Sequence, residues 1–310
     1  MSKKHKWNIS FKTIKIPLLL IIIFYGIAFW RYFATGKIFF IYNFVYIGTS
    51  LALGGFLNDA LPKKHILWGR RISQFLVGIY MLGYLGYIQH ENMQIEGFFF
   101  YLFSGIFAAA TLHYFIAKII GPIILNRGWC GWACWTAMVL DFLPWKKPTG
   151  RIKNLEIIRY IHFFLSLGLV SYFWFILGIR DINEYSMIEF YWFAIGNLSY
   201  YLIAIVLAAV LKDNRAFCKY VCPIPPLQKV LSGYALLKMS IDADKCNDCY
   251  LCEKNCPMGI SLLSYKNEGK RILSTECIIC STCANVCPKG AIKMTMKFDK
   301  GKRKEYLRYR

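Results

Sequence analysis

Twelve cysteines are the residues of this 310-residue chain best suited to redox or metal chemistry, and eight of them fall in two matching groups. Residues 246–257 read CNDCYLCEKNCP and residues 277–288 read CIICSTCANVCP, so the same gaps recur 31 residues apart. Three thiolates with two residues between neighbours can hold three corners of one cubane cluster, while the fourth, followed by proline, is directed to the other cluster. The pattern predicts an internal duplication that binds two [4Fe-4S] clusters.

The spacing also predicts which thiolates share a cluster. The first set is Cys246, Cys249, Cys252 and Cys287, and the second set is Cys277, Cys280, Cys283 and Cys256. A pair of zinc sites is the alternative, since paired CxxC units also hold zinc. Zinc would use two pairs of thiolates and gives no role to the third cysteine or to the Cys-Pro ending, so we favour iron-sulfur clusters.

The rest of the chain is mostly apolar. Hydrophobic residues make up 57% of it, which exceeds what one soluble core needs and is typical of a membrane protein. A helix needs about 20 apolar residues to cross a bilayer. We expect about six transmembrane helices, near residues 16–34, 38–60, 72–90, 97–123, 157–179 and 188–211. The predicted fold is a membrane all-α bundle with a C-terminal α+β two-cluster ferredoxin-like domain.

The pattern along the chain divides it into four parts. We expect a transmembrane helical domain at 1–215, a CxxxCP junction at 216–239, the ferredoxin-like domain at 240–295 and a basic tail at 296–310. Adhesion to anionic lipid is the simpler interpretation of the tail, and docking of an acidic partner is the alternative.

Charge gives the expected orientation in the membrane. The formal net charge is +21, but Lys and Arg mostly flank the apolar stretches, so we interpret them as topology signals and predict no nucleic-acid partner. Cations are frequent in the N-terminal segment and in the loops 63–71 and 127–153, and rare in the loops between them. The positive-inside rule then predicts an inner-membrane protein with both termini and all twelve cysteines in the cytoplasm.

The remaining four cysteines form two CxxxC pairs, CGWAC and CKYVC. They are Cys130, Cys134, Cys218 and Cys222. The cytoplasm is reducing, so metal or redox chemistry explains these thiols better than structural disulfides. Each pair follows a helix predicted to run inward, and the two pairs can therefore meet at the cytoplasmic membrane face. We predict a third centre there, of the iron-sulfur kind; a redox-active dithiol and unliganded thiols are the alternatives.

These features together resemble a known family. The double ferredoxin motif, the multi-helix bundle and the sequences CGWAC and CKYVCP are similar to those of the NapH-type membrane ferredoxins, and the resemblance covers most of the chain from about residue 97 onward. The superfamily also includes nitrous-oxide-reductase regulator proteins and the copper-reducing accessory proteins of cytochrome oxidase. The resemblance implies electron transfer between the quinone pool, or another membrane donor, and a redox protein partner.

Two histidines lie inside predicted spans. His113 stands in AAATLHYFIAKII and His162 in RYIHFFLSL. Ionisable side chains within membrane helices are functional candidates by default. Contact with a quinone head group is one hypothesis, and ligation of a haem by both residues is a less favoured one. A hydrogen bond between helices is the interpretation that we favour.

The sequence therefore predicts a membrane-bound iron-sulfur electron-transfer protein, with three hypotheses for its role. It is a quinol dehydrogenase-type oxidoreductase subunit, an accessory reductase that matures a metal- or cofactor-containing enzyme, or a ferredoxin relay without a substrate of its own. No glycine-rich nucleotide loop or flavin attachment motif is evident, so the sequence leaves the donor unidentified.

Overall fold

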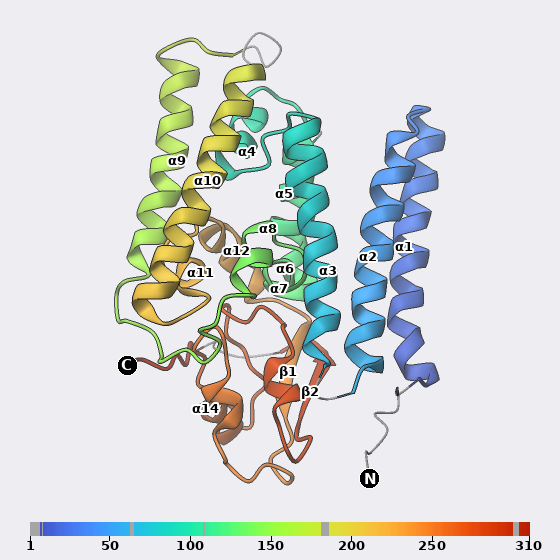
Figure 1. The fold of residues 1–310 in the computed structure, drawn as a ribbon, viewed down its shortest axis with the longest axis vertical. Coiled ribbons are helices and arrows are strands. Elements are labelled where there is room, and N and C mark those ends of the chain that lie inside the picture. Colours follow the sequence, from blue (N-terminus) through green and yellow to red (C-terminus); the bar gives the residue numbers. More distant parts are fainter. Residues whose placement is uncertain (1–6, 8, 63–64, 108, 181–185, 300–303) are drawn as a thin grey trace. The chain divides into compact units, whose positions relative to one another are not determined.

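The computed structural model describes residues 7, 9–62, 65–107, 109–180, 186–299 and 304–310 (Figure 1). The chain forms two compact units: the first holds residues 1–80 with 131–138, and the second holds residues 81–130 with 139–310. Some cations of the predicted charge pattern lie outside the described residues: Lys3, Lys4, Lys6, Lys63, Lys64 and those of 300–303.

The first unit is built on three helices, α1 (Phe11–Thr35), α2 (Phe39–Ala60) and α3 (Leu67–Ile79). α2 packs against both of the others. A Cβ built on Gly54 of α2 would lie 2.2 Å from the Cβ of Ser73 on α3, so the two backbones approach as closely as small residues allow. Arg70 of α3 donates to the carbonyl oxygen of Gly131 (2.9 Å), which fixes the segment 131–138 to this unit.

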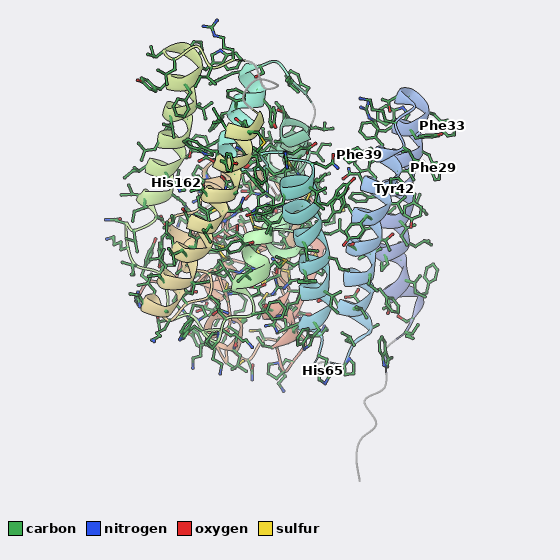
Figure 2. All side chains as sticks on the ribbon, turned by 45° about the horizontal axis from the view of Figure 1, so that its top comes forward. Phe29, Phe33, Phe39, Tyr42, His65 and His162 are labelled. Carbon is green, nitrogen blue, oxygen red and sulfur yellow. The ribbon has the colours of Figure 1, made fainter. Side chains whose placement is uncertain are left out.

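The outer faces of α1 and α2 are apolar. Figure 2 shows Phe29, Phe33 and Tyr42 on these helices, and Phe33 is 80% exposed. Exposed apolar side chains along a helix are suited to contact with lipid. Within the described residues, four helical segments are long and apolar enough to span a membrane: Thr13–Thr35, Phe39–Ala60, Ile157–Phe175 and Met187–Leu211. The last two belong to α9 (Ile157–Phe175) and α10 (Ser186–Leu211) of the second unit.

The other two expected spans are not single α-helices. Residues 72–90 comprise the end of α3 and the π-helical segment η1 (Tyr80–Ile88). Residues 97–123 are divided among α4 (Ile95–Phe103), α5 (Ala109–Tyr114), η2 (Phe115–Ile120) and α6 (Gly121–Leu125). Gly105 ends α4 with a φ of +69°, a backbone conformation that glycine adopts without strain. The expectation of one helix over 97–123 is therefore corrected, and six spans remain a prediction.

Aromatic residues of α4 form the core at one end of the second unit. Phe98, Phe99 and Phe100 are buried together with Tyr114 of α5 and Val170 of α9. The rings of Phe98 and Tyr114 stack with centroids 4.6 Å apart. Because α4 packs against both α9 and α5, its polar residue Glu96 is also buried.

Four short helices contain or follow the CxxxC cysteines in the chain. They are α7 (Gly128–Trp132), α8 (Trp135–Leu140), α11 (Ala216–Tyr220) and α12 (Ile224–Ser232). α12 packs on η2, α6 and α9.

The C-terminal region is ferredoxin-like. Its two strands, β1 (Leu237–Ile241) and β2 (Ile292–Met296), pair antiparallel, with Leu237 opposite Met296. Three short helices lie between them in sequence: α13 (Leu251–Lys254), α14 (Leu262–Asn267) and α15 (Thr282–Asn285).

The duplication seen in the sequence recurs in the backbone. α13 and α15 begin 31 residues apart. Left-handed residues recur at the same offset, as the pairs Asp248 and Ile279, Tyr250 and Ser281, and Gly259 and Gly290. Such conformations are uncommon outside glycine, so their repetition shows that both halves follow the same path around their cysteines.

The described end of the basic tail packs on this region. Leu307 bridges Ile260, and Tyr309 bridges Arg151. The Arg308 guanidinium donates to the carbonyl oxygen of Pro148 (2.6 Å). Residues 304–310 are thus held by protein contacts, while the lipid and acidic-partner interpretations of the tail stay predictions.

Arg271 ties together the ends of both strands. Its guanidinium forms an ion pair with Asp299 (2.5 Å) and donates to the carbonyl oxygens of Leu236 (3.1 Å) and Thr295 (2.7 Å).

Arg271→Ala should destabilise the region by about 3–5 kcal/mol, because buried acceptors lose a charged donor. The test is the temperature at which detergent-solubilised protein loses its visible cluster absorbance. The control is Lys270→Ala, which removes an exposed ion pair and should change the free energy of unfolding by less than about 1 kcal/mol. Equal thermal midpoints for the two variants would contradict the role of Arg271 in holding the strand ends together.

Candidate iron-sulfur site

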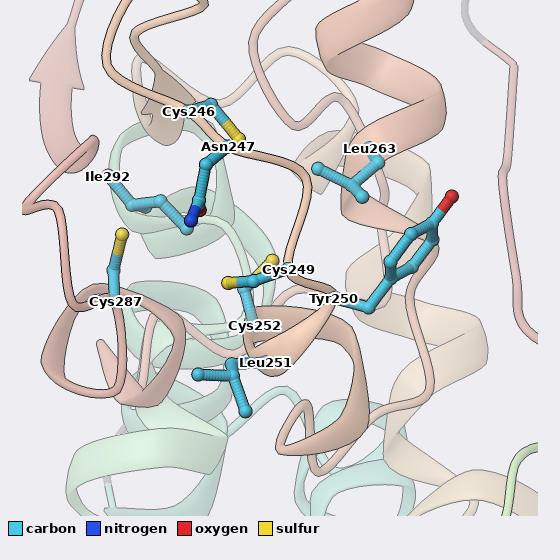
Figure 3. A pocket seen from close by; sticks show the side chains of 9 residues that line it. All are labelled: Cys246, Asn247, Cys249, Tyr250, Leu251, Cys252, Leu263, Cys287 and Ile292. Carbon is cyan, nitrogen blue, oxygen red and sulfur yellow. The ribbon is translucent and has the colours of Figure 1, made fainter.

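The first predicted cysteine set surrounds a hollow of about 300 Å³ in the ferredoxin-like region (Figure 3). Its lining comprises Cys246, Cys249, Cys252, Cys287, Asn247, Tyr250, Leu251, Leu263 and Ile292. The backbone N–H of Ala291 donates to the Cys287 sulfur (3.3 Å), the kind of amide contact that supports a metal-bound thiolate. Cys287 reaches this hollow from the second half of the duplication, as the spacing predicts.

The second set surrounds another hollow, of about 370 Å³. Its lining includes Cys256, Cys277, Cys280 and Cys283, with apolar side chains such as Met239, Ile260, Leu262 and Ile272. Each hollow thus contains three cysteines of one half and one of the other. Four thiols around an apolar space suit a cubane cluster, so these residues fit the cofactor. Their roles as ligands stay a prediction.

The two sets differ in their access to solvent. Cys249 of the first set is exposed, and Cys246 and Cys287 are half-buried. In the second set, Cys256, Cys277 and Cys280 are all buried. The first site therefore lies nearer the surface than the second. Both sets contribute to the core cluster that contains Cys130, through Cys252 of the first set and Cys256, Cys277 and Cys280 of the second.

Three of the four CxxxC cysteines belong to the second unit. Cys130 and Cys218 are buried there, and Cys222 is half-buried. Cys134 belongs to the first unit, so a site of all four thiolates stays a prediction. Within the second unit, Arg215 donates to the Cys130 carbonyl oxygen (3.2 Å) and contacts the Cys218 sulfur (3.8 Å).

Buried polar groups hold these cysteines in place. The carboxylate of Asp141 accepts two hydrogen bonds from Arg215 (2.7 and 2.8 Å), which fixes the plane of the guanidinium. The Cys130 thiol donates to the amide oxygen Oε1 of Gln228 on α12 (3.2 Å), and Gln228 is fully buried. Arg215 thus places a positive charge beside the Cys218 sulfur, and Gln228 holds the Cys130 side chain.

A buried carboxylate joins the helical part of the second unit to the loop before Cys277. Glu276 forms ion pairs with four cations, at distances of 2.7 Å to Arg127, 3.4 Å to Arg151, 2.7 Å to Arg159 and 2.9 Å to Lys229. The carboxylate and the three arginines are fully buried. Burial alone raises the pKa of Glu276, but the cations lower it well below its usual range. Glu276 is therefore ionised.

Arg127 extends this contact to the cysteines. Its backbone N–H donates to the Cys277 carbonyl oxygen (3.3 Å). Its charge also interacts with Cys130, Cys218 and Cys222. A single arginine thus lies between the buried cysteine set and the CxxxC cysteines of this unit.

His162 is fully hydrogen-bonded. Its Nδ1 lies 2.8 Å from the Val221 carbonyl oxygen, and its Nε2 lies 3.1 Å from the Tyr200 hydroxyl. A carbonyl oxygen only accepts, so Nδ1 carries the hydrogen and Nε2 accepts from tyrosine. These contacts support the interpretation of His162 as a hydrogen-bonded residue between helices.

His113 has a different environment. Its ring is buried edge-on against Trp129, with centroids 4.7 Å apart, and its Nε2 has no hydrogen-bond partner. The Lys118 ammonium lies 4.9 Å from the centre of the same Trp129 ring. A quinone contact of either histidine stays a prediction.

Several residues of the site were not identified from the sequence. Glu276, Arg159, Arg215 and Gln228 carry no motif, and their partners are distant in the chain. Arg159 did offer a signal, because it lies near the start of an apolar span where an arginine must find a partner.

Replacing Glu276 tests its structural role. In Glu276→Gln, four cations lose their shared counter-charge in a buried site, so we expect a loss of about 3–5 kcal/mol in stability. The measurement is the thermal midpoint and cluster content of the protein in detergent. The matched control, Glu268→Gln, removes a carboxylate whose ion pair with Lys270 is partly exposed. Equal thermal midpoints in the two variants would show that the ion pairs of Glu276 with the four cations do not stabilise the folded protein.

Comparisons with known proteins agree with this site. Residues 238–288 match the family described as 4Fe-4S dicluster domain, and residues 98–151 and 200–241 match the family described as 4Fe-4S binding domain. Uncharacterized protein MJ0749 of Methanocaldococcus jannaschii is 30% identical over 262 residues, which cover 81% of this chain and 95% of that protein. No solved structure matches.

Two further relatives have names that describe them as ferredoxin-type proteins. Ferredoxin-type protein NapH of Haemophilus influenzae is 25% identical over 200 residues, 59% of this chain and 67% of that protein. Methylamine utilization ferredoxin-type protein MauN of Methylorubrum extorquens is 23% identical over 182 residues, 56% of this chain and 63% of that protein. The chain belongs to the NapH-type membrane ferredoxin family and is a ferredoxin-type electron-transfer protein with 4Fe-4S domains.

Proposed function

We propose that this protein transfers electrons between membrane quinol and a redox protein partner, through two [4Fe-4S] clusters and a third centre at the CxxxC cysteines. The observation that carries the proposal is the core of the second unit, in which the buried cysteine set and Cys130 belong to one cluster of packed side chains. Bound clusters supply one-electron carriers whose potentials depend on charge, hydrogen bonds and solvent access.

The residues around each cysteine set suit different tasks. The surface set lies beside Tyr250 and Leu251, which are 53% and 39% exposed. An aromatic and an aliphatic side chain next to the exposed Cys249 give a redox partner an apolar contact. The buried set is shielded from water, which suits an internal carrier. This order directs electrons between the bundle and the surface.

The third centre rests on the CxxxC pairs. The family match described as 4Fe-4S binding domain covers the segments that contain both pairs. Arg127 and Arg215 interact electrostatically with CxxxC cysteines of the second unit, and such positive charges suit a site of metal-bound thiolates. Cys134, four residues after Cys130, supplies the fourth thiolate of the proposed set.

The membrane arrangement in this proposal has six crossings, with both termini and the cysteine-rich region in the cytoplasm. It rests on the cation-rich loops and on four helices of sufficient length. The cations that bind Glu276 come from the loops and helix ends on the side that faces the cysteine-rich region, as the positive-inside rule expects.

Metal analysis distinguishes two clusters from three. We expect about twelve iron and twelve acid-labile sulfide per chain in anaerobically purified protein, since each of three cubanes holds four of each. Cys218→Ser should lower both counts by about four, while Cys249→Ser should disturb only the surface set. About eight irons in the unaltered protein would refute the third centre, and abundant zinc with little iron would refute the electron-transfer mechanism itself.

Quinol-driven reduction tests the donor. A short-chain quinol added to oxidised protein in detergent should bleach the cluster absorbance and produce the EPR signals that dithionite produces. Dithionite is the control, because it reduces clusters without a quinol site. Reduction by dithionite alone would contradict the quinol proposal and favour an accessory reductase or a relay supplied by another protein.

A further inference from the structure

Two glutamates lie close together where α10 begins. Glu96 is the second residue of α4, and Glu189 lies in the first turn of α10. The two carboxyl groups interact electrostatically. In Figure 1, α4 lies beside the end of α10 that is farther from β1 and β2. We call Glu96 and Glu189 the carboxylate pair.

The surroundings of the pair are polar and specific. The Ser166 hydroxyl on α9 donates to Oε1 of Glu96 (2.6 Å), and Oε2 of Glu96 has no hydrogen-bond partner although the side chain is 92% buried. Glu189 is hydrogen-bonded to the side chain of Asn92, and its own Oε2 is also without a partner. Each carboxyl therefore retains one oxygen that can carry a proton.

A third polar side chain is fitted into the same region. Gln94 is buried against α10, where a Cβ on Gly196 would lie only 2.4 Å from its amide oxygen. Its Nε2 has no hydrogen-bond partner. Glycine at this position of α10 makes room for a buried amide, which stands two residues before Glu96 in the chain.

The charge of the pair has no ion-pair partner among the described residues. In the described part of the chain, neither Glu96 nor Glu189 forms an ion pair with a Lys, Arg or His side chain. Two neighbouring carboxylates in a low-dielectric region repel each other, and ionising both without a cation is costly.

Polar groups continue from the pair in both directions. Towards the cysteines, Ser166 is one helical turn from His162, which binds Tyr200 and the carbonyl oxygen of Val221 beside Cys222. Tyr200 lies eleven residues after Glu189 on α10, so the polar groups on this side extend about 16 Å along the helix axis from the carboxylate pair towards the cysteines.

In the other direction, the polar groups approach solvent. The Tyr101 hydroxyl interacts electrostatically with Glu189 and with Glu91, a half-buried residue of the loop before α4. Burial raises the pKa of Glu91 to about 7, so this loop residue can exchange protons near neutral pH.

We infer that the carboxylate pair is a proton-transfer site, which takes up protons released within the bundle and passes them towards the loop that contains Glu91. The inference rests on the proposed function, because the protons come from membrane quinol. Each quinol loses two electrons, which go to the iron-sulfur centres, and two protons, which leave one after the other through the pair. Glu96 holds each proton on Oε2, and Ser166 fixes the orientation of its carboxyl group.

Infrared difference spectroscopy detects the proton directly. Reduced-minus-oxidised spectra of the intact protein, recorded electrochemically, should contain the carbonyl band of a protonated carboxylic acid, shifted in D₂O. Glu96→Gln and Glu189→Gln should each abolish or reduce that band, and Ser166→Ala should change its frequency because the carboxyl group loses a hydrogen bond. The surface variant Glu268→Gln should leave it unchanged.

Reduction kinetics give the second measurement. In Glu96→Gln, reduction of the clusters by quinol should slow by at least about 100-fold, the range expected when a general base is removed. Reduction by dithionite, the iron content and the EPR signals should stay as in the unaltered protein, which separates this effect from misfolding.

The outcomes distinguish this inference from the proposed function. An unchanged carbonyl band and unchanged quinol kinetics in both glutamine variants would overturn the carboxylate pair, while quinol reduction by the unaltered protein would stand. If quinol fails to reduce the unaltered protein, the proposed function fails, and the redox-linked band alone then decides whether the pair exchanges protons.

Discussion

The second unit depends on a balance of buried charge at Glu276. One carboxylate faces three arginines and a lysine, so the group as a whole keeps an excess of positive charge away from water. Such an excess is costly unless other anions lie nearby. Arg127 interacts electrostatically with Cys130, Cys218 and Cys222, and Cys277 directly follows Glu276. Glu156, which pairs with Arg151 (2.8 Å), supplies part of this balance, and thiolates bound to a cluster would supply more.

The cysteine arrangement could be predicted from the sequence because it is local. Gaps of two residues fix how three thiols can surround one space, and the same left-handed residues recur in both halves. The Cys-Pro ending indicated that the fourth cysteine of each half belongs to the site of the other half. Both hollows are lined by three cysteines of one half and one of the other, in agreement with that expectation. Four apolar runs also became long helices, since length and hydropathy suffice to define them.

Other features depend on contacts that local patterns do not contain. The interruption at Gly105 lies within a run that is apolar on both sides, so hydropathy alone does not separate α4 from α5. Glu276 and Arg159 are 117 residues apart in the chain, and no periodicity links them. Glu96 precedes a run of aromatic residues and looks like a loop residue until α4 is seen to be enclosed by α9 and α5. Each of these outcomes was decided by tertiary packing.

The exchange of one cysteine between the two halves has a consequence for the origin of the fold. A single half offers three thiols around its own hollow and sends the fourth away, so it cannot complete a four-thiol site by itself. Two identical copies related by a twofold axis could complete both sites, because each copy would lend its last cysteine to the other. The present duplication is what such a symmetric dimer becomes when its gene duplicates and the two copies fuse: a pseudo-symmetric domain in which neither half completes a four-thiol site without the other.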